Sequence, residues 1–262
     1  MNLLKEINLY LNTLGLNSKK FLLSVKGIPA FLKNHSRFKA LLKVNNSEFS
    51  ISKIYPCLDD RFQSAGDISL HYFFQDLFVA QRIYLNNPQK HVDIGSRLDG
   101  FVSHVASFRE IEVLDIRKID YVISNVKFVQ ADITSEDFIN HNYCDSVSCL
   151  HVIEHLGLGR YGDNLDVNGH LKGLDNIYKL LKAGGKFYFS TPIGRQRIEY
   201  NAHRVFSVRY LLNLFEGKYR IDIFSFIDDN NLLHENVQLN NDIINSNCGC
   251  SFGCGIFEMT KL

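Results

Sequence analysis

An alternation of short apolar runs with helical stretches, beginning after Pro88, constrains the fold of this chain more than any other feature. Runs typical of strands cover residues 91–94, 111–116, 126–133, 145–152 and 186–192. Apolar residues at helical spacing separate several of these runs, most clearly at 167–182. This order predicts an α/β fold whose parallel sheet is covered by helices on both faces. Residues 219–228 and 254–262 instead predict an antiparallel pair of strands.

The first 66 residues lack this alternation and are predicted to form an N-terminal helical extension. Apolar residues recur there at helical spacing, and we expect Pro29 and Asn45-Asn46 to interrupt the helix. A helix rich in aromatic residues follows at 68–85. The sequence therefore predicts two parts, the extension at 1–66 and a second domain at 67–262.

The charge of the whole chain is nearly balanced, with 29 Lys and Arg against 28 Asp and Glu and a formal net charge of +1. Bulk charge therefore indicates neither a nucleic-acid partner nor an acidic membrane surface, although a local basic groove stays open. Each apolar run is too short to span a bilayer, and the N-terminus lacks the pattern of a signal peptide. We therefore expect a cytoplasmic protein whose six cysteines are free thiols.

The loop after the first predicted strand carries glycine where parallel sheets bind their ligands. It reads Asp93-Ile94-Gly95-Ser96-Arg97-Leu98-Asp99-Gly100. Compared with the dinucleotide fingerprint G-x-G-x-x-G, Arg97 replaces the middle glycine. Because that glycine lets the backbone approach a pyrophosphate, the loop favours a cofactor without one. The cofactor-binding residues predicted in this loop are Asp93, Gly95, Ser96 and Arg97.

Two carboxylates follow at the ends of the next two strands. Asp115 lies 22 residues after Asp93, near the spacing of a ribose-binding acid, and its two oxygens suit a ribose diol. Asp132 ends the third strand, where a carboxylate can accept a hydrogen bond from an adenine amino group. Together they predict a nucleoside site. We add to the cofactor-binding residues Ile116, Ile133 and Gln75.

The segment His151-Val152-Ile153-Glu154-His155 matches the H-x-x-E-H pattern of a class of zinc proteases. Those proteases need a continuous helix, whereas this segment follows a strand-like run and precedes a glycine-rich loop. A cysteine cluster near the end of the chain lacks an evident fourth zinc ligand; it consists of Cys248, Cys250 and Cys254. We predict no bound metal. The alternative is a divalent ion held by His155, Asp163, Asp166 and His203.

In their order and spacing these features resemble the class I methyltransferases, which bind S-adenosylmethionine on a Rossmann-like sheet. The chain resembles most closely a bacterial family of unknown function, family two-sixty-eight, which often occurs among surface-polysaccharide genes. The segments that carry the resemblance are Gln75-Asp76, 91–97, 151–163, 169–171, 190–197, 201–206 and 253–258. The resemblance implies a mostly parallel seven-stranded sheet with an antiparallel C-terminal strand, and S-adenosylmethionine as the cofactor.

The resemblance also implies a reaction, O-methylation of a sugar or surface-polysaccharide intermediate. A hydroxyl acceptor needs a base, and we predict His155 or His203 in this role, with His151 lining the cofactor. We expect a small-molecule or glycan acceptor that is acidic or phosphorylated. The residues predicted to bind it are Glu154, Arg160, Asp163, Arg195 and Arg204. The alternative, which Arg97 leaves open, is a regulatory or binding protein that keeps the fold without transfer.

Overall fold

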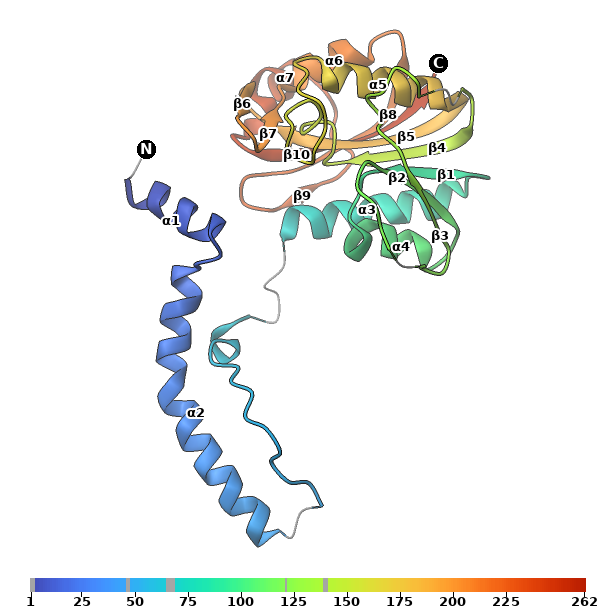
Figure 1. Cartoon of the computed structure of the whole chain (residues 1–262). Coiled ribbons are helices and arrows are strands. Elements are labelled where there is room, and N and C mark those ends of the chain that lie inside the picture. Colours follow the sequence, from blue (N-terminus) through green and yellow to red (C-terminus); the bar gives the residue numbers. More distant parts are fainter. Residues whose placement is uncertain (1–2, 46–47, 65–68, 121, 139–140) are drawn as a thin grey trace. The chain divides into compact units, whose positions relative to one another are not determined.

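The alternating part of the chain folds into one sheet with strand order β3-β2-β1-β4-β5-β10-β8-β9 (Figure 1). In that order the strands cover Val126–Gln130, Ile111–Asp115, His91–Ile94, Cys144–Leu150, Leu181–Ile193, Gly253–Lys261, Tyr219–Ile227 and Leu233–His234. The computed structural model describes residues 3–45, 48–64, 69–120, 122–138 and 141–262. Chain order reverses between β1 and β4, which is where open parallel sheets bind ligands.

The sheet is mostly parallel. β1 pairs in parallel with β2 and β4, β2 with β3, and β4 with β5. β10 runs antiparallel between β5 and β8, so the predicted mostly parallel sheet with antiparallel strands at the end of the chain is confirmed. The described residues form eight strands in this sheet rather than seven, because the two-residue β9 pairs with the end of β8. A strand this short leaves no alternating pattern in the sequence.

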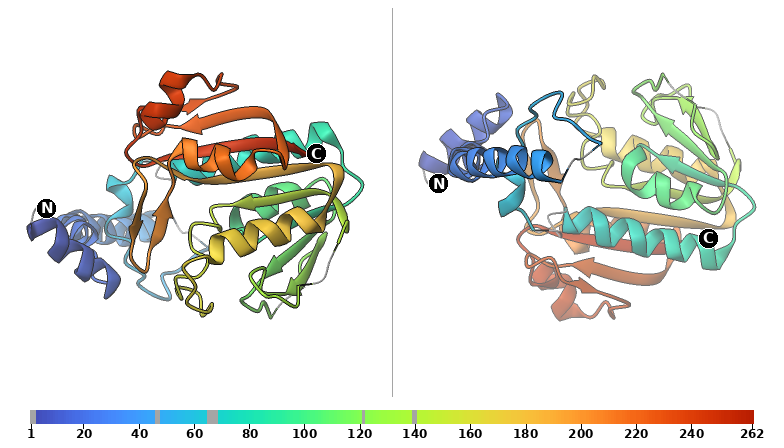
Figure 2. Two further views of the ribbon diagram at one scale, coloured as in Figure 1. Left: turned by 90° about the horizontal axis from the view of Figure 1, so that it is seen from above. Right: turned by 90° about the horizontal axis from the view of Figure 1, so that it is seen from below.

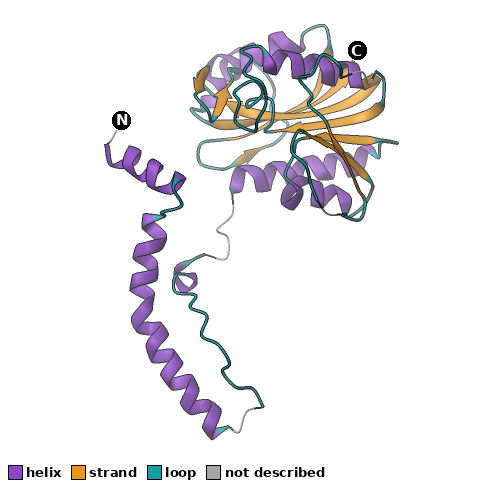
Figure 3. Ribbon diagram, viewed as in Figure 1, coloured by secondary structure: helices purple, strands orange, loops and turns teal. Residues whose placement is uncertain are grey.

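Helices cover both faces of the sheet (Figure 2, Figure 3). One face carries α3 (Leu70–Asn86), η2 (Leu98–Val102) and α4 (Ser103–Ala106). The other carries α5 (Gly169–Leu180), α6 (Val208–Phe215), α7 (Asn241–Ser246) and η3 (Asn247–Gly249). Because side chains alternate along a strand, Phe187 and Phe189 of β5 pack with α5 and α6, whereas Tyr188 packs with α3 and α4. Each face therefore has its own apolar core.

Residues 1–68 form a unit of their own, separate from residues 69–262. The first unit contains α1 (Leu3–Thr13), α2 (Ser18–Val44) and the short turn η1 (Asp60–Phe62). The expectation that Pro29 interrupts the helix is wrong, since α2 continues through it. Proline costs this helix one backbone hydrogen bond, but the ring is exposed and water can satisfy the freed carbonyl.

The helix α2 ends directly before Asn45, as expected, and Asn46 lies outside the described residues. The predicted boundary between residues 66 and 67 also falls outside them.

None of the described helices combines the length and the apolar character that crossing a membrane requires.

Glu258 on β10 ties α3 to the sheet. Its carboxylate accepts hydrogen bonds from Arg82 Nε at 2.7 Å and from Asn86 Nδ2 at 3.0 Å, both on α3. Lys186 Nζ on β5 lies 3.4 Å from the same carboxylate. The Glu258 side chain is only 4% exposed, so water screens these attractions weakly. The position of α3 over the sheet therefore depends on a buried charge.

We expect Glu258→Gln to lower the free energy of unfolding by about 2 kcal/mol, because it leaves Arg82 and Lys186 beside a neutral buried group. Urea denaturation followed by circular dichroism measures this change. The control is Asp175→Asn, which breaks the exposed Asp175–Lys179 pair and should cost less than about 0.5 kcal/mol. Equal losses in the two variants would contradict the role of Glu258 as an anchor.

Candidate functional site

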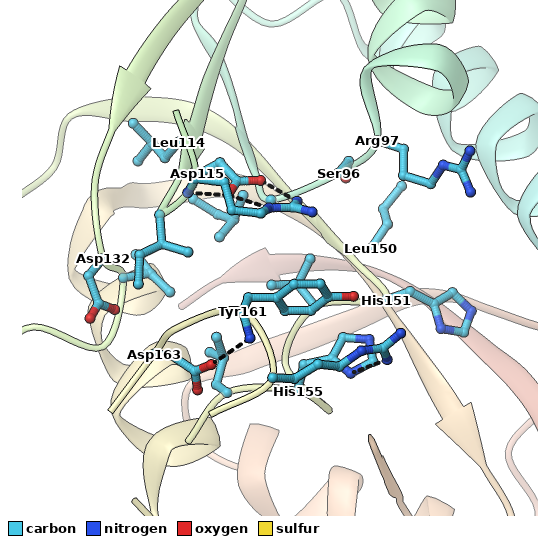
Figure 4. A pocket seen from close by; sticks show the side chains of 18 of the residues that line it. Ser96, Arg97, Leu114, Asp115, Asp132, Leu150, His151, His155, Tyr161 and Asp163 are labelled. Atoms are coloured by element: carbon cyan, nitrogen blue, oxygen red, sulfur yellow. Dashed lines mark hydrogen bonds and ion pairs between the residues drawn. The ribbon is translucent and has the colours of Figure 1, made fainter. Parts of the chain in front are cut away.

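A cavity of about 360 Å³ opens beyond the carboxyl ends of β1, β2, β3 and β4, and we call it the strand-end pocket (Figure 4). Its volume falls in the range of small-molecule sites. The predicted cofactor-binding residues that line it are Gln75, Gly95, Ser96, Arg97, Asp115, Ile116, Asp132, Ile133 and His151. The predicted catalytic and acceptor-binding residues that line it are His151, His155, Arg160 and Asp163. Most of the predicted site is thus gathered in one cavity.

Asp93 is fully buried under the strand-end pocket and shapes the loop that lines it. Its carboxylate accepts hydrogen bonds from the Ser96 backbone N–H at 2.9 Å and from Ser96 Oγ at 2.8 Å. Ser148 Oγ on β4 donates a third at 2.6 Å. Burial raises the pKa of Asp93 to about 6, although these hydrogen bonds oppose the shift. Asp93 therefore supports the cofactor loop from below instead of lining the cavity.

His91 extends this chain of hydrogen bonds into the sheet. Because Ser148 Oγ donates its proton to Asp93, it can only accept from His91 Nε2, 3.1 Å away. His91 Nδ1 is then unprotonated and accepts from Ser146 Oγ at 2.7 Å. Burial lowers the pKa of His91 to about 3, so the ring stays neutral at physiological pH.

The two strand-end carboxylates differ in their surroundings. Asp115 at the end of β2 is held by Arg117, whose Nε and Nη2 atoms donate to it at 2.9 and 2.6 Å. The Arg117 side chain is 51% exposed, so this pair is worth roughly 0–1 kcal/mol and is easily exchanged. Asp132 after β3 accepts at one oxygen, Oδ1, from the backbone N–H and the hydroxyl of Thr134. Both carboxylates stand at the wall of the pocket (Figure 4).

Gln75 on α3 is 1% exposed and holds its neighbour in place. Its Nε2 donates to Asp76 Oδ1 at 2.9 Å, and its Oε1 accepts from Ser190 Oγ. Burial raises the pKa of Asp76, which also lines the pocket. A Cβ at Gly100 would lie 2.6 Å from Asp76 Oδ2, so a larger residue there would displace this carboxylate. Sequence reasoning missed Asp76, although an acid among the apolar residues of this helix was a usable signal.

His151 and Glu154 form a buried pair just after β4. His151 Nδ1 lies 2.8 Å from Glu154 Oε1, and Glu154 is 1% exposed. Burial acts to lower the pKa of His151, but the Cys254 sulfur and the Glu154 carboxylate outweigh it and hold this pKa well above 6.5. The same contact lowers the pKa of Glu154 against the effect of its burial. The pair is therefore ionic, and Glu154 faces His151 instead of lining the pocket.

His155 is a neutral imidazole in the wall of the pocket. Its Nδ1 donates to the Ala202 carbonyl at 2.7 Å, which leaves Nε2 as the unprotonated nitrogen, 3.8 Å from Glu154 Oε1. Burial, followed by the charges of Arg160 and His151, lowers the pKa of His155 against the opposing effect of Glu154. Of the three predicted histidines, His155 alone combines a lining position with the protonation state of a base.

Other predicted residues lie outside the pocket. The Arg204 guanidinium is buried and donates to the Leu156 carbonyl at 2.6 Å, so it holds the loop after β4 and is not free for an acceptor. His203 Nε2 lies 3.2 Å from Glu199 Oε2. Both belong to the hairpin of β6 (Arg197–Glu199) and β7 (His203–Val205). Arg195 is exposed before this hairpin and does not line the pocket.

Asp163 lines the pocket, but its carboxylate is hydrogen-bonded to the backbone of its own loop. Its carboxylate accepts from the backbone N–H groups of Gly157 at 2.7 Å and of Gly159 and Tyr161 at 3.2 Å.

Sequence reasoning missed Tyr161, whose ring contacts two cations. The Cζ atoms of Arg117 and Arg160 lie 4.8 and 5.0 Å from its centroid. Tyr72, also missed, lines the pocket from α3.

The zinc-protease interpretation does not fit this geometry. His151 has a left-handed backbone with φ of 54°, so no continuous helix places His151 and His155 on one face. Across the described ranges no cluster of three or more His, Cys, Asp or Glu side chains is arranged to hold a metal ion. All six cysteines are free, which confirms the prediction of free thiols.

Comparison with solved structures identifies the fold. The structure of Burkholderia thailandensis 1,6-didemethyltoxoflavin-N1-methyltransferase, with bound 1,6-didemethyltoxoflavin and S-adenosylhomocysteine, is 12% identical. It matches 74% of this chain and 79% of its own with a TM-score of 0.52. The [4+2]-cyclase SpnF is 13% identical, matching 82% of this chain and 85% of its own with a TM-score of 0.50. Residues 69–262 therefore have the methyltransferase-like Rossmann fold, as predicted.

The chain belongs to the family described as Caenorhabditis protein of unknown function, DUF268, whose model matches residues 98–248, more than half of the sequence. No protein with a curated function matches it. The family description gives neither a bacterial source nor a link to surface polysaccharides, so these two implications of the resemblance gain no support from it. A methyltransferase and a cyclase share the fold, so the reaction has to be argued from the site.

The buried imidazole of His91 makes stability depend on acid. The pKa of His91 is about 3 in the folded state and ordinarily 6.5, so in this range the unfolded chain binds a proton that the folded chain does not. The contribution of His91 to the free energy of unfolding is therefore complete above pH 6.5 and is lost as the pH falls toward 3. Asp93, whose pKa rises from 3.8 to about 6, acts in the opposite direction between those values. The two groups therefore partly cancel in the native protein.

We expect His91→Gln to remove the His91 share of this dependence. Between neutral pH and about pH 4.5, the stability of the native protein relative to the variant should fall by about 3 kcal/mol. Urea denaturation at both pH values measures it. His141→Gln is the control, because that side chain is exposed. Parallel stability curves for the native protein and His91→Gln would show that His91 is not a buried neutral ring.

Proposed function

We propose that this chain is an S-adenosylmethionine-dependent methyltransferase that binds its cofactor in the strand-end pocket. One observation carries the proposal: Asp115 and Asp132 stand at the ends of successive strands around one cavity, beyond the glycine loop of β1. A carboxylate at the end of the second strand suits a ribose diol, and one at the third suits an adenine amino group. Ile116 and Ile133 line the cavity beside them and offer apolar contact for the adenine.

The residues present fit an adenosyl cofactor. Gly95 has φ of 68°, which favours glycine, and it lines the cavity together with Ser96. Arg97 stands where the dinucleotide fingerprint has its middle glycine, so the loop does not allow the close backbone approach that a pyrophosphate needs. The exposed Arg117 side chain can leave Asp115 for solvent when ribose hydroxyls replace it. When bound, the cofactor supplies a methyl group on a positively charged sulfur.

We assign His155 as the general base of the transfer. Its Nδ1–H is fixed on the Ala202 carbonyl, and its Nε2 can accept the proton of an acceptor hydroxyl. His151, held as a cation by Glu154, is unsuited to accept a proton and is assigned to the cofactor side of the pocket. His203 lies outside the cavity, with its ring centroid 6.4 Å from that of His155. A hydroxyl acceptor must lose a proton during the transfer, so a neutral imidazole in the pocket wall supports O-methylation.

The acceptor side of the pocket supports a small, anionic, hydroxylated molecule such as an acidic sugar. Tyr161 offers an aromatic face, and its side chain is partly exposed. Arg160 lines the cavity beside it; its Nη1 donates to the Ala202 carbonyl at 3.0 Å, and the other N–H groups of its exposed guanidinium can bind a carboxylate or phosphate. Arg195 and Arg204 are left out of this assignment, since the first is exposed outside the pocket and the second is engaged with backbone carbonyls.

We expect the purified chain to bind S-adenosylhomocysteine, and Asp115→Asn to weaken binding about 10- to 100-fold, because hydrogen bonds to a charged acceptor are lost. Isothermal titration calorimetry measures the dissociation constant. The control is Asp120→Asn, an exposed acid on the same loop that pairs with Lys118. If the native chain did not bind S-adenosylhomocysteine, the proposal would be wrong. Equal affinity of both variants would remove Asp115 from the ribose site.

We expect His155→Gln to lower methyl transfer at least about 100-fold, because the base is lost while the cofactor site is intact. The measurement is transfer of labelled methyl from S-adenosylmethionine to acidic oligosaccharides, with S-adenosylhomocysteine binding as a second readout. His141→Gln serves as the control. Undiminished transfer by His155→Gln would reject this base. Cofactor binding by the native chain without any transfer would favour the alternative of a binding protein.

A further inference from the structure

The helix α2 carries a high density of positive charge that the net charge of the whole chain does not reveal. Its 27 residues hold seven Lys and Arg residues and no Asp or Glu. The rest of the sequence therefore has 22 basic against 28 acidic residues, since the totals are 29 and 28. A net charge of +1 for the chain is the sum of a basic helix and an acidic remainder. A helix this one-sided in charge favours an anionic partner.

One side of α2 is covered by residues of its own unit. Residues 48–64 run back along the helix (Figure 1), and the Leu58 carbonyl fits against Gly27, where a Cβ would lie 1.9 Å from its oxygen. Lys26 Nζ lies 4.9 Å from the centroid of the Phe62 ring on the same returning segment. Gly27 is accordingly the buried residue of α2 among those described.

Another side of α2 is apolar and is left exposed by the described residues of its own unit. Phe21, Val25, Ile28 and Leu32 follow the spacing i, i+4, i+7 and i+11, so they lie on one face of the helix. Leu22 borders this face. Their exposed fractions are 68% for Phe21, 66% for Leu22, 49% for Val25, 41% for Ile28 and 59% for Leu32. We call these five residues the outer apolar face.

A row of basic residues runs along one edge of the outer apolar face, next to Leu22. Lys19, Lys26 and Lys33 recur every seven residues, and Arg37 follows one turn after Lys33. Lys19, Lys33 and Arg37 are exposed. Long basic side chains beside an apolar face can extend their charges to lipid headgroups while their stems stay in the interface. Apolar and basic groups in this arrangement are typical of helices that lie flat in a membrane surface.

We propose that α2 binds the surface of an anionic lipid membrane, with the outer apolar face in the acyl boundary and the basic side chains on the headgroups. The outer apolar face extends over about 17 Å of the helix axis, from Phe21 to Leu32, and this part of the helix would lie in the plane of the interface. A nucleic acid would use the charges but would leave the outer apolar face in water. A second copy of the same helix would bring seven positive charges against seven.

The proposal is tested by flotation of the full-length chain with vesicles. We expect binding to phosphatidylcholine mixed with phosphatidylserine, little binding to phosphatidylcholine alone, and release at high salt. The triple change of Lys19, Lys33 and Arg37 to Gln should weaken partitioning on the order of 100-fold, since each charge contributes about fivefold. The matched control is the triple change of Lys118, Lys182 and Lys218 to Gln, which should bind like the native chain.

A second pair of variants tests the apolar part. Phe21→Gln with Leu32→Gln should weaken vesicle binding at least about tenfold. The exposed pair Val122→Gln with Leu232→Gln is the control. Circular dichroism checks that the apolar variants keep their helix content. If these variants lose it, the charge variants still test the proposal.

Three outcomes would overturn the membrane proposal: no binding to anionic vesicles, apolar variants that bind like the native chain, or a dimer by light scattering that these apolar variants abolish. Tighter binding to a DNA duplex than to vesicles, unaffected by the apolar variants, would instead identify a nucleic-acid surface.

Discussion

The pairing of β1 with β4 at the point where strand order reverses determines the geometry of the whole pocket. Asp93 and Ser148 are register partners in these strands, and the Ser148 hydroxyl donates to the Asp93 carboxylate at 2.6 Å. A slip of one residue would turn Ser148 to the other face of the sheet and leave a buried carboxylate without this partner. The same carboxylate holds the Ser96 backbone, so strand register and cofactor loop are fixed together.

The three histidines around the loop after β4 show how environment divides roles among identical side chains. His151 faces a buried carboxylate and is held as a cation, whereas His155 donates to a backbone carbonyl and stays neutral. His203 lies in the hairpin beside Glu199 and does not reach the pocket. A cationic and a neutral imidazole four residues apart thus supply a charged group and a base, and the described residues hold no cluster of metal ligands.

Local features of the sequence were enough to predict the strands and the acids at their ends, because Asp115 and Asp132 directly follow apolar runs. Asp76 and Tyr161 were missed because α3 and the loop after β4 reach the pocket only through packing with distant strands. Arg204 was expected to bind an acceptor, since an arginine beside the site loops can grip a phosphate or carboxylate, but its guanidinium is buried against backbone carbonyls. The tautomer of His155 depends on the Ala202 carbonyl, 47 residues away in the sequence, and its neutral state depends on burial.

Bulk composition was also misleading about charge, because a sum of +1 conceals a basic helix in one unit and an acidic excess elsewhere. The two units differ in what they bury. The strand-end pocket depends on burial and on carboxylates held in place, whereas α2 exposes apolar and basic side chains together. Attachment of α2 to an anionic surface would confine the pocket to a thin layer of solvent. Confinement raises the effective concentration of acceptors at the same surface without any new contact in the pocket. A modest acceptor affinity, built from one arginine and one aromatic ring, would then suffice.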